Sequence, residues 1–169
     1  MTESDFERYL KKLKLRESDL RGKRLVDCGC GYGAFVKTCL DIGLTDSVYG
    51  IDEYLETMPG YEDHFKTGDF FDPLPWDKLD YIFFVRSLFY DCFNEKQFAK
   101  LIGQLLERLK PAGEIRISPV EHLVGNSTSR EVICAIVGVL DSYPCNYTLT
   151  PLPTPSERRT EKLLIIGRI

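Results

Sequence analysis

Hydrophobic residues near the N-terminus recur at helical spacing. Four of them fall at positions i, i+3, i+4 and i+7 of one helical face: Phe6, Tyr9, Leu10 and Leu13. Ser4 and Glu7 have the spacing of a capping box, in which each side chain accepts a hydrogen bond from the other residue's backbone N–H. The pattern predicts a surface helix from residue 4 to about residue 14 that packs across the main body or covers a ligand.

The rest of the chain alternates between short apolar segments and helical patterns. Strands are expected at residues 24–28, 47–52, 64–67, 80–85, 114–118, 147–149 and 163–166. Helices are expected at residues 34–42, from about 94 to 109, and from about 129 to 140. This alternation, followed by a terminal pair of strands, predicts a three-layer α/β sheet. Residues 80–85 are almost wholly apolar, so we expect them to form the most buried strand.

The composition is that of one mildly acidic globular domain. The 169 residues contain 22 Lys and Arg against 26 Asp and Glu, a formal net charge of −4 at pH 7. This balance argues against the non-specific nucleic-acid binding that a large basic excess produces. We expect no membrane span and no signal peptide, because the apolar runs are short. The six cysteines form no CxxC pair, so we expect reduced thiols in the cytoplasm and no metal site.

A glycine-rich turn follows the first predicted strand. Its sequence is Gly29-Cys30-Gly31-Tyr32-Gly33, and a helical pattern begins directly after it. Glycine has no Cβ, so the backbone N–H groups of such a turn can approach a bound ligand closely. In open α/β sheets, ligands bind beyond the carboxyl ends of the strands. We therefore expect the binding site at the end of this strand.

An aspartate stands at the end of the second predicted strand. Asp52 comes about 20 positions after the glycines, where a carboxylate can accept hydrogen bonds from both hydroxyls of a ribose. Glycine turns and exposed aspartates are each common in proteins that bind no nucleotide. Their combination is more specific, and it indicates a ligand that contains a ribose.

These features resemble the class I S-adenosylmethionine-dependent methyltransferases, and the resemblance runs from about Lys23 to Ile169. The first motif of that family, acidic-x-Gly-x-Gly-x-Gly, stands here at residues 27–33. In the family it binds the methionine half of the cofactor. The resemblance therefore implies cofactor contacts from Asp27, Cys28, Gly29, Gly31 and Gly33. It also implies that the Asp52 carboxylate holds the ribose.

Two further segments match the family in order and spacing. Asp69 matches the acidic residue that faces the adenine amino group, and Phe70 matches the wall contact beside it. Residues 109–114 match the Leu-Lys-Pro-Gly-Gly turn before the fifth strand, with Ala112 in place of one glycine. The resemblance implies an α/β, three-layer, doubly wound, seven-stranded and mostly parallel sheet with a C-terminal antiparallel strand, the Rossmann-like methyltransferase fold.

The resemblance also implies the domain layout and the activity. Residues 1–169 are expected to form a single methyltransferase domain, with residues 1–22 as an N-terminal helical lid and residues 23–169 as the cofactor-binding fold. The expected cofactor is S-adenosyl-L-methionine. Family members with this compact layout most often methylate small molecules, which is the acceptor class we expect here. A protein or RNA acceptor stays open, as does the oligomeric state.

Two alternatives belong to other classes of protein. A nicotinamide-dinucleotide-binding oxidoreductase is one, because Gly29-x-Gly31-x-x-Ala34 also satisfies the looser dinucleotide fingerprint. A catalytically silent, methyltransferase-like subunit that binds a partner is the other. The cofactor motifs argue against it, since a silent copy has no physical need to keep Asp52 and Asp69 together with the glycine turn.

The acceptor side of the site is less specific in sequence. Residues 86–93 lack the Asn/Asp-Pro-Pro-Tyr/Phe motif of relatives that methylate adenine N6 or glutamine. Arg86 and Tyr90 are candidates for contacts with cofactor or substrate, Arg86 as a cofactor-binding residue and Tyr90 also as a catalytic residue. His122 is a candidate proton acceptor after the fifth strand. Arg158 and Arg159 are candidates for holding a carboxylate or phosphate. For His122 and the arginine pair, a solvated position without a chemical role is the alternative interpretation.

Overall fold

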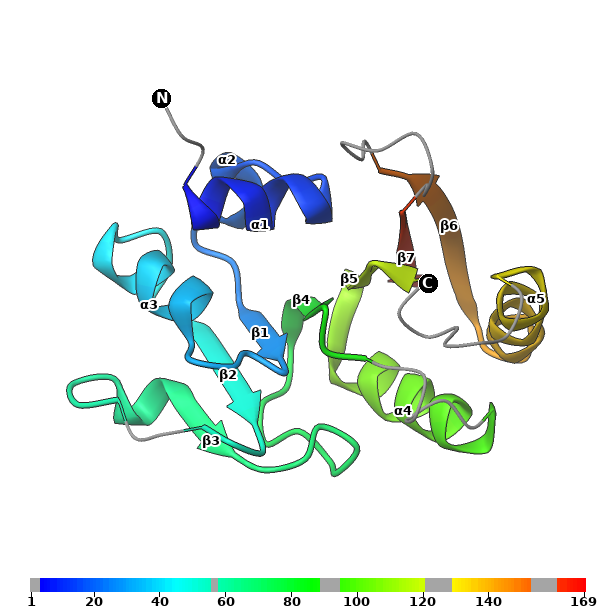
Figure 1. Ribbon diagram of the computed structural model, residues 1–169. Coiled ribbons are helices and arrows are strands. Elements are labelled where there is room, and N and C mark those ends of the chain that lie inside the picture. The colour runs from blue at the N-terminus through cyan, green and yellow to red at the C-terminus, as the bar shows by residue number, and fades with distance from the viewer. Residues whose placement is uncertain (1–3, 56–57, 89–94, 121–128, 153–160) are drawn as a thin grey trace.

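A seven-stranded sheet forms the centre of the computed structural model, which describes residues 4–55, 58–88, 95–120, 129–152 and 161–169 (Figure 1). The strands are β1 (Leu25–Cys28), β2 (Val48–Asp52), β3 (Phe65–Thr67), β4 (Leu79–Val85), β5 (Leu109–Ser118), β6 (Cys145–Pro151) and β7 (Lys162–Arg168). Their spatial order is β3-β2-β1-β4-β5-β7-β6. The order reverses between β1 and β4, and β7 runs antiparallel to both of its neighbours. The expected doubly wound sheet is confirmed.

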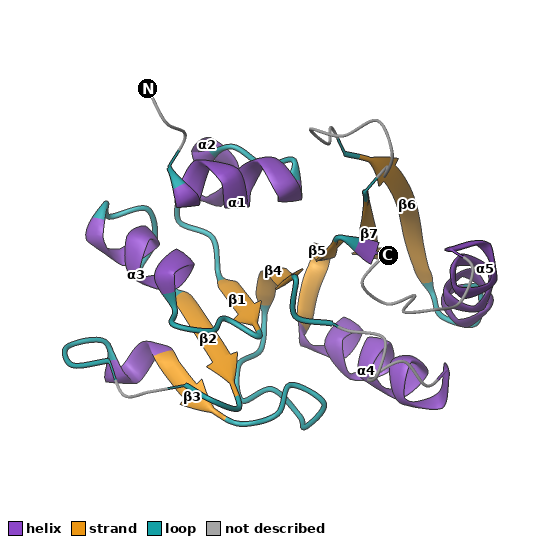
Figure 2. Ribbon diagram, viewed as in Figure 1, coloured by secondary structure: helices purple, strands orange, loops and turns teal. Residues whose placement is uncertain are grey.

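Helices cover both faces of this sheet, which makes three layers (Figure 2). One face carries α1 (Asp5–Leu13), α2 (Glu17–Leu20) and α3 (Ala34–Asp41), and the other carries α4 (Glu95–Arg108) and α5 (Ser129–Leu140). A short 3-10 helix, η1 (Glu62–His64), precedes β3. Among the helices that the structure describes, none has the length and apolar character needed to cross a membrane.

Side chains alternate between the two faces along each strand. In β4, Ile82 and Phe84 pack in the core beneath α4, whereas Phe83 packs beneath α1 and α3. The prediction that this strand is the most buried is wrong, since Asp80, Tyr81 and Val85 are half-buried. All four residues of β1 are buried instead. The reason is position: β1 lies between β2 and β4, and helices cover both of its faces.

The N-terminal helix is part of the packed body. Ser4 and Glu7 form the expected capping box, and Leu10 and Leu13 are buried against the sheet. The guanidinium of Arg116, on β5, donates to the carbonyls of Leu13 and Lys14 and so holds the end of α1. The second helix, α2, has no counterpart in the sequence-based predictions, because four residues carry no readable periodicity.

Several strand boundaries differ from the predictions. His64 lies in η1 rather than in the third strand, and its Nδ1 is 2.9 Å from the carbonyl oxygen of Val48. The fifth strand begins at Leu109, with a bulge opposite Leu79–Tyr81 in which Ala112 has φ +62°. The terminal strands are longer than predicted, pairing from Cys145–Arg168 to Pro151–Lys162. Polar side chains in β6 hid that length from the apolar pattern.

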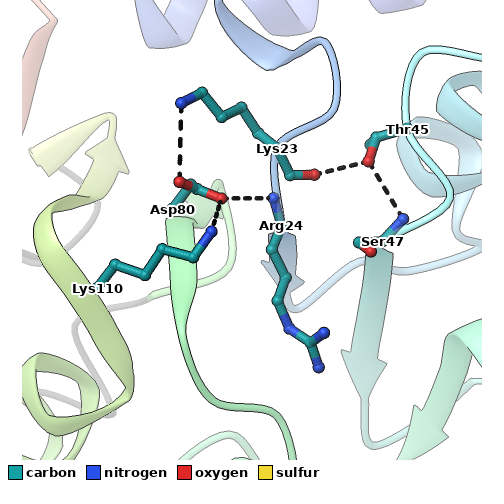
Figure 3. Close-up of polar contacts among 6 residues, drawn as sticks. All are labelled: Lys23, Arg24, Thr45, Ser47, Asp80 and Lys110. Carbon is teal, nitrogen blue, oxygen red and sulfur yellow. Dashed lines mark hydrogen bonds and ion pairs between the residues drawn. The ribbon is translucent and has the colours of Figure 1, made fainter.

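Polar contacts tie together the amino ends of the central strands (Figure 3). The carboxylate of Asp80 accepts hydrogen bonds from the backbone N–H of Arg24 at 2.8 Å and from Lys110 Nζ at 2.7 Å, and Lys23 Nζ lies 3.8 Å away. Burial works against the charged carboxylate, but the Lys110 hydrogen bond and the other donors outweigh it and lower the pKa of Asp80. These contacts stabilise the amino ends of the central strands, opposite the carboxyl ends where the glycine turn lies.

Candidate functional site

The glycine turn lies at the carboxyl end of β1, beside the end of β2. Gly29, Gly31 and Gly33 all have positive φ, at +73°, +54° and +66°. A Cβ on Gly29 would lie 2.1 Å from Ser87 Cβ, and one on Gly33 would lie 2.4 Å from the Phe65 ring. A Cβ on Gly31 would meet no atom within 4 Å. Two of the glycines therefore permit close packing within the protein, and Gly31 leaves open space beside the turn.

Four backbone N–H groups of the turn donate hydrogen bonds within the protein. Gly29 N and Cys30 N donate to the carbonyl oxygen of Ile51, at 2.7 and 3.2 Å, and Gly33 N donates to that of Cys30 at 2.9 Å. Gly31 N donates to the Asp52 carboxylate at 2.9 Å. The sequence-based expectation was that these groups face a ligand. In the structure, Gly29, Cys30 and Gly31 fasten the turn to β2 through these bonds, and the open side of Gly31 leaves room for a ligand.

Asp52 joins the glycine turn to the loops that follow β2 and β3. Its two carboxylate oxygens accept hydrogen bonds from Gly31 N and Tyr54 N, each at 2.9 Å, and its carbonyl oxygen accepts one from Gly68 N at 3.1 Å. The side chain is half-buried. A carboxylate oxygen has two acceptor sites, so each oxygen of Asp52 keeps one for a further donor. That capacity fits a pair of ribose hydroxyls.

Asp69 and Phe70 follow β3, the neighbour of β2. The Asp69 carboxylate accepts a hydrogen bond from Phe71 N at 2.8 Å, which fixes the local turn. The Phe70 ring stands edge-on to Phe84 with 5.3 Å between centroids and packs against the core. The structure thus brings both residues to the edge of the sheet that carries Asp52 and the glycine turn. Their contacts with a cofactor remain predictions.

Asp27 is a buried carboxylate whose hydrogen-bond donor comes from the N-terminal helix. It is 3% exposed, and the Tyr9 hydroxyl donates to its Oδ1 at 2.5 Å. Burial raises the pKa of Asp27 to about 7, although the hydrogen bond from Tyr9 works in the opposite direction. Burial and the nearby Asp27 carboxylate also raise the pKa of Tyr9 well above its ordinary value.

Tyr9 was absent from the sequence-based site, since it fits the apolar stripe of its helix. The hydroxyl was the available signal, because a tyrosine in a buried stripe needs a hydrogen-bond partner. That signal does not say which residue the partner is. The pairing depends on how α1 crosses the sheet, and only the tertiary structure shows this.

Cys28 and Arg86 have different surroundings from the other predicted cofactor contacts. The Cys28 side chain is fully buried in the core on the α4 face, which leaves only its backbone for a ligand. Arg86 is exposed at the end of β4, with φ +59° and its N–H bonded to Ser118 O at 2.8 Å. Lys12 of α1 lies near it: burial, then the Arg86 charge, lower the pKa of Lys12.

The remaining candidates lie outside the described residues. Tyr90, His122, Arg158 and Arg159 fall in the ranges 89–94, 121–128 and 153–160. Their proposed roles in proton transfer and in substrate binding stay predictions.

The strand order, the single antiparallel strand and the acidic residue facing a glycine turn together define a class I methyltransferase domain. The family model of the O-methyltransferase domain matches residues 4–142. The chain belongs to that family, which confirms its sequence-based identification as an S-adenosylmethionine-dependent methyltransferase. A comparison with curated proteins found no match.

Solved methyltransferase structures share the fold along most of this chain. The N-methyltransferase NodS from Bradyrhizobium japonicum WM9, in complex with S-adenosylhomocysteine, has a TM-score of 0.65 and 17% identity, covering 98% of this chain and 89% of that one. The plantazolicin methyltransferase BpumL, also with S-adenosylhomocysteine, has a TM-score of 0.66 and 15% identity, covering 99% and 87%. The 1,6-didemethyltoxoflavin N1-methyltransferase from Burkholderia thailandensis has a TM-score of 0.61 and 13% identity, covering 90% and 76%.

Proposed function

We propose that this protein transfers the methyl group of S-adenosylmethionine to a small-molecule acceptor. The observation that carries the proposal is the hydrogen bond between Asp52 and Gly31, which joins the two cofactor motifs at the carboxyl edge of the sheet. Membership of the O-methyltransferase domain family supports the reaction type. The structures that share the fold include enzymes named for a toxoflavin precursor and for plantazolicin, which supports a small organic or peptide-derived acceptor.

The reaction asks this chain to bind and orient two molecules. When bound, the cofactor supplies a methyl group on a positively charged sulfur, which an acceptor atom attacks in line. Holding donor and acceptor in contact can provide much of the rate enhancement without a catalytic group. Asp52 is suited to fix the ribose, the open side of Gly31 leaves room for the cofactor, and Asp27 adds a buried carboxylate beside the turn.

The need for a base depends on the acceptor. A nucleophile that is already deprotonated at pH 7 needs none, whereas an alcohol or a protonated amine must lose a proton during the reaction. His122 remains the candidate for accepting it, and Tyr90 remains a candidate catalytic residue. Arg158 and Arg159 remain the candidates for binding an anionic acceptor.

Calorimetry of cofactor binding tests the proposal. We expect wild-type protein to bind S-adenosylhomocysteine and not NAD. Asp52→Ala should weaken S-adenosylhomocysteine binding by about 1–3 kcal/mol, because it removes a charged hydrogen-bond acceptor. The matched control is Asp46→Ala, which removes an exposed carboxylate before the amino end of the same strand and should leave affinity unchanged. Binding of NAD alone would favour the oxidoreductase alternative.

A screen of metabolites with labelled methyl donor tests the acceptor class. We expect wild-type protein to label one chemical family of small molecules, and Asp52→Ala to label it more slowly. Binding of the cofactor without labelling of any small molecule, protein or RNA would favour the catalytically silent subunit instead.

A further inference from the structure

Tyr9 connects the N-terminal helix to the cofactor motif. It lies on α1, yet its hydroxyl donates to Oδ1 of Asp27, the acidic residue that begins the motif at the end of β1, at 2.5 Å. The sequence predicts an N-terminal helical lid and, separately, a cofactor contact at Asp27. The structure joins these two separate features through one hydrogen bond.

Aromatic packing holds the Tyr9 ring in place independently of that hydrogen bond. The Tyr9 ring stacks on Phe35 of α3 with 4.3 Å between centroids and 17° between planes, and Phe6 stacks on the same Phe35 ring with 5.7 Å between centroids. Phe83 of β4 meets Tyr9 edge-on at 6.5 Å. Because stacking already holds the ring in place, the hydrogen bond from the hydroxyl to Asp27 can have a role other than anchoring the helix.

We propose that Tyr9 is a positioning residue for cofactor binding, whose hydroxyl fixes the Asp27 carboxylate so that tight binding requires α1 to be seated on α3. The proposal rests on the function proposed above. A buried carboxylate needs a donor to hold its orientation, and here the donor comes from an element outside the sheet. Loss of α1 packing would therefore release Asp27 at the same time.

The electrostatics around Asp27 give this role a measurable signature. Among the residues that the structure describes, those that interact with Asp27 electrostatically are Tyr9 from α1, Cys28 and Cys30 from β1 and the turn, Cys39 from α3 and Asp52 from β2. None of these is cationic, and burial raises the pKa of each thiol, so the thiols stay neutral at pH 7. Asp27 therefore changes charge near pH 7, mainly because it is buried.

S-adenosylhomocysteine carries an α-ammonium group, which an ionised Asp27 attracts. We therefore expect its affinity for wild-type protein to rise with pH through about pH 7. The Tyr9 hydrogen bond lowers the pKa of Asp27. Removal of the hydroxyl raises that pKa further, so the rise in affinity moves to higher pH.

Calorimetry of S-adenosylhomocysteine binding from pH 5.5 to 8.5 tests the proposal with Tyr9→Phe. This variant keeps the ring and loses only the hydroxyl. We expect about tenfold weaker binding near pH 7 and a midpoint shifted to higher pH. Tyr143→Phe is the matched control, since it removes a part-buried hydroxyl that donates to the Ala99 carbonyl at 2.5 Å on the other face of the sheet. Its binding curve should match that of wild type.

Asp27→Asn provides a second measurement. Its amide oxygen can still accept from Tyr9, but the group does not titrate, so we expect weaker binding that no longer varies through pH 7. Tyr9→Phe binding equal to wild type at every pH overturns the inference. So does a uniform loss without a shifted midpoint, because that result indicates a purely structural role. Failure of wild-type protein to bind S-adenosylhomocysteine would instead overturn the proposed function, and this inference with it.

Discussion

The buried carboxylate of Asp27 should make the ligand-free protein less stable as pH rises. Burial raises the pKa of Asp27 from 3.8 to about 7 on folding. The native state therefore holds this proton at pH values where the unfolded chain has lost it. The stability associated with the protonated carboxyl is complete below about pH 4 and is lost as pH increases to about 7.

The size of the effect follows from the two pKa values. Each pKa unit corresponds to about 1.4 kcal/mol, so the rise from 3.8 to about 7 amounts to about 4 kcal/mol of unfolding free energy. Between pH 5 and pH 8 the loss is about 2–3 kcal/mol. Asp27→Asn removes the titration while keeping an acceptor for the Tyr9 hydroxyl, so the variant should not suffer this loss.

Urea unfolding of wild-type protein and of Asp27→Asn at pH 5 and pH 8 measures this loss of unfolding free energy. Other carboxylates titrate in both proteins, so the informative quantity is the difference between their unfolding free energies at each pH. We expect the variant to gain about 2–3 kcal/mol on wild type between these two values. Differences that stay equal at pH 5 and pH 8 would refute the reasoning. A variant that is more stable yet binds cofactor more weakly would show that this charge serves binding at the expense of the fold.

Three other substitutions test the fold and the site. Gly31→Val should abolish S-adenosylhomocysteine binding by filling the open side of the turn, whereas Gly22→Val, which has similar strain at φ +67° and equally open surroundings, should bind normally by calorimetry. Ala112→Gly should raise the unfolding free energy by about 1 kcal/mol, measured in urea, because it relieves a left-handed alanine. Asp80→Ala should lower it by about 1–2 kcal/mol at pH 7, with the difference shrinking below pH 4 as the wild-type carboxylate is protonated.

Local sequence signals were enough to predict most of the architecture. The capping box at Ser4 and Glu7 and the apolar stripe after it specify α1. The left-handed Gly43 ends α3, with its N–H bonded to the Leu40 carbonyl. These signals are readable because each depends on neighbours in the chain. The same holds for the strand, glycine turn and helix that begin the cofactor fold, whose match to a known motif led to the methyltransferase family.

Boundaries set by pairing were not readable in the same way. The bulge at Ala112 exists because Leu109 of β5 pairs with Leu79 of β4, whereas Glu114 of β5 pairs with Tyr81, only two residues further along β4. The full length of β6 and β7 likewise comes from mutual hydrogen bonding over seven positions, although the alternate residues of β6 are polar. Register between strands is a relation between distant segments, and no local pattern contains it.

The sequence by itself determined the class of the protein and which residues lie at the carboxyl ends of β1, β2 and β3. Only the tertiary structure decided what those residues do to one another. In that structure, the amides of Gly29, Cys30 and Gly31 donate hydrogen bonds to Ile51 and Asp52, and the Tyr9 hydroxyl donates one to Asp27. The reason is that charge, burial and hydrogen-bond partners depend on the packing of α1 and β2 around β1, and that packing joins segments far apart in the chain.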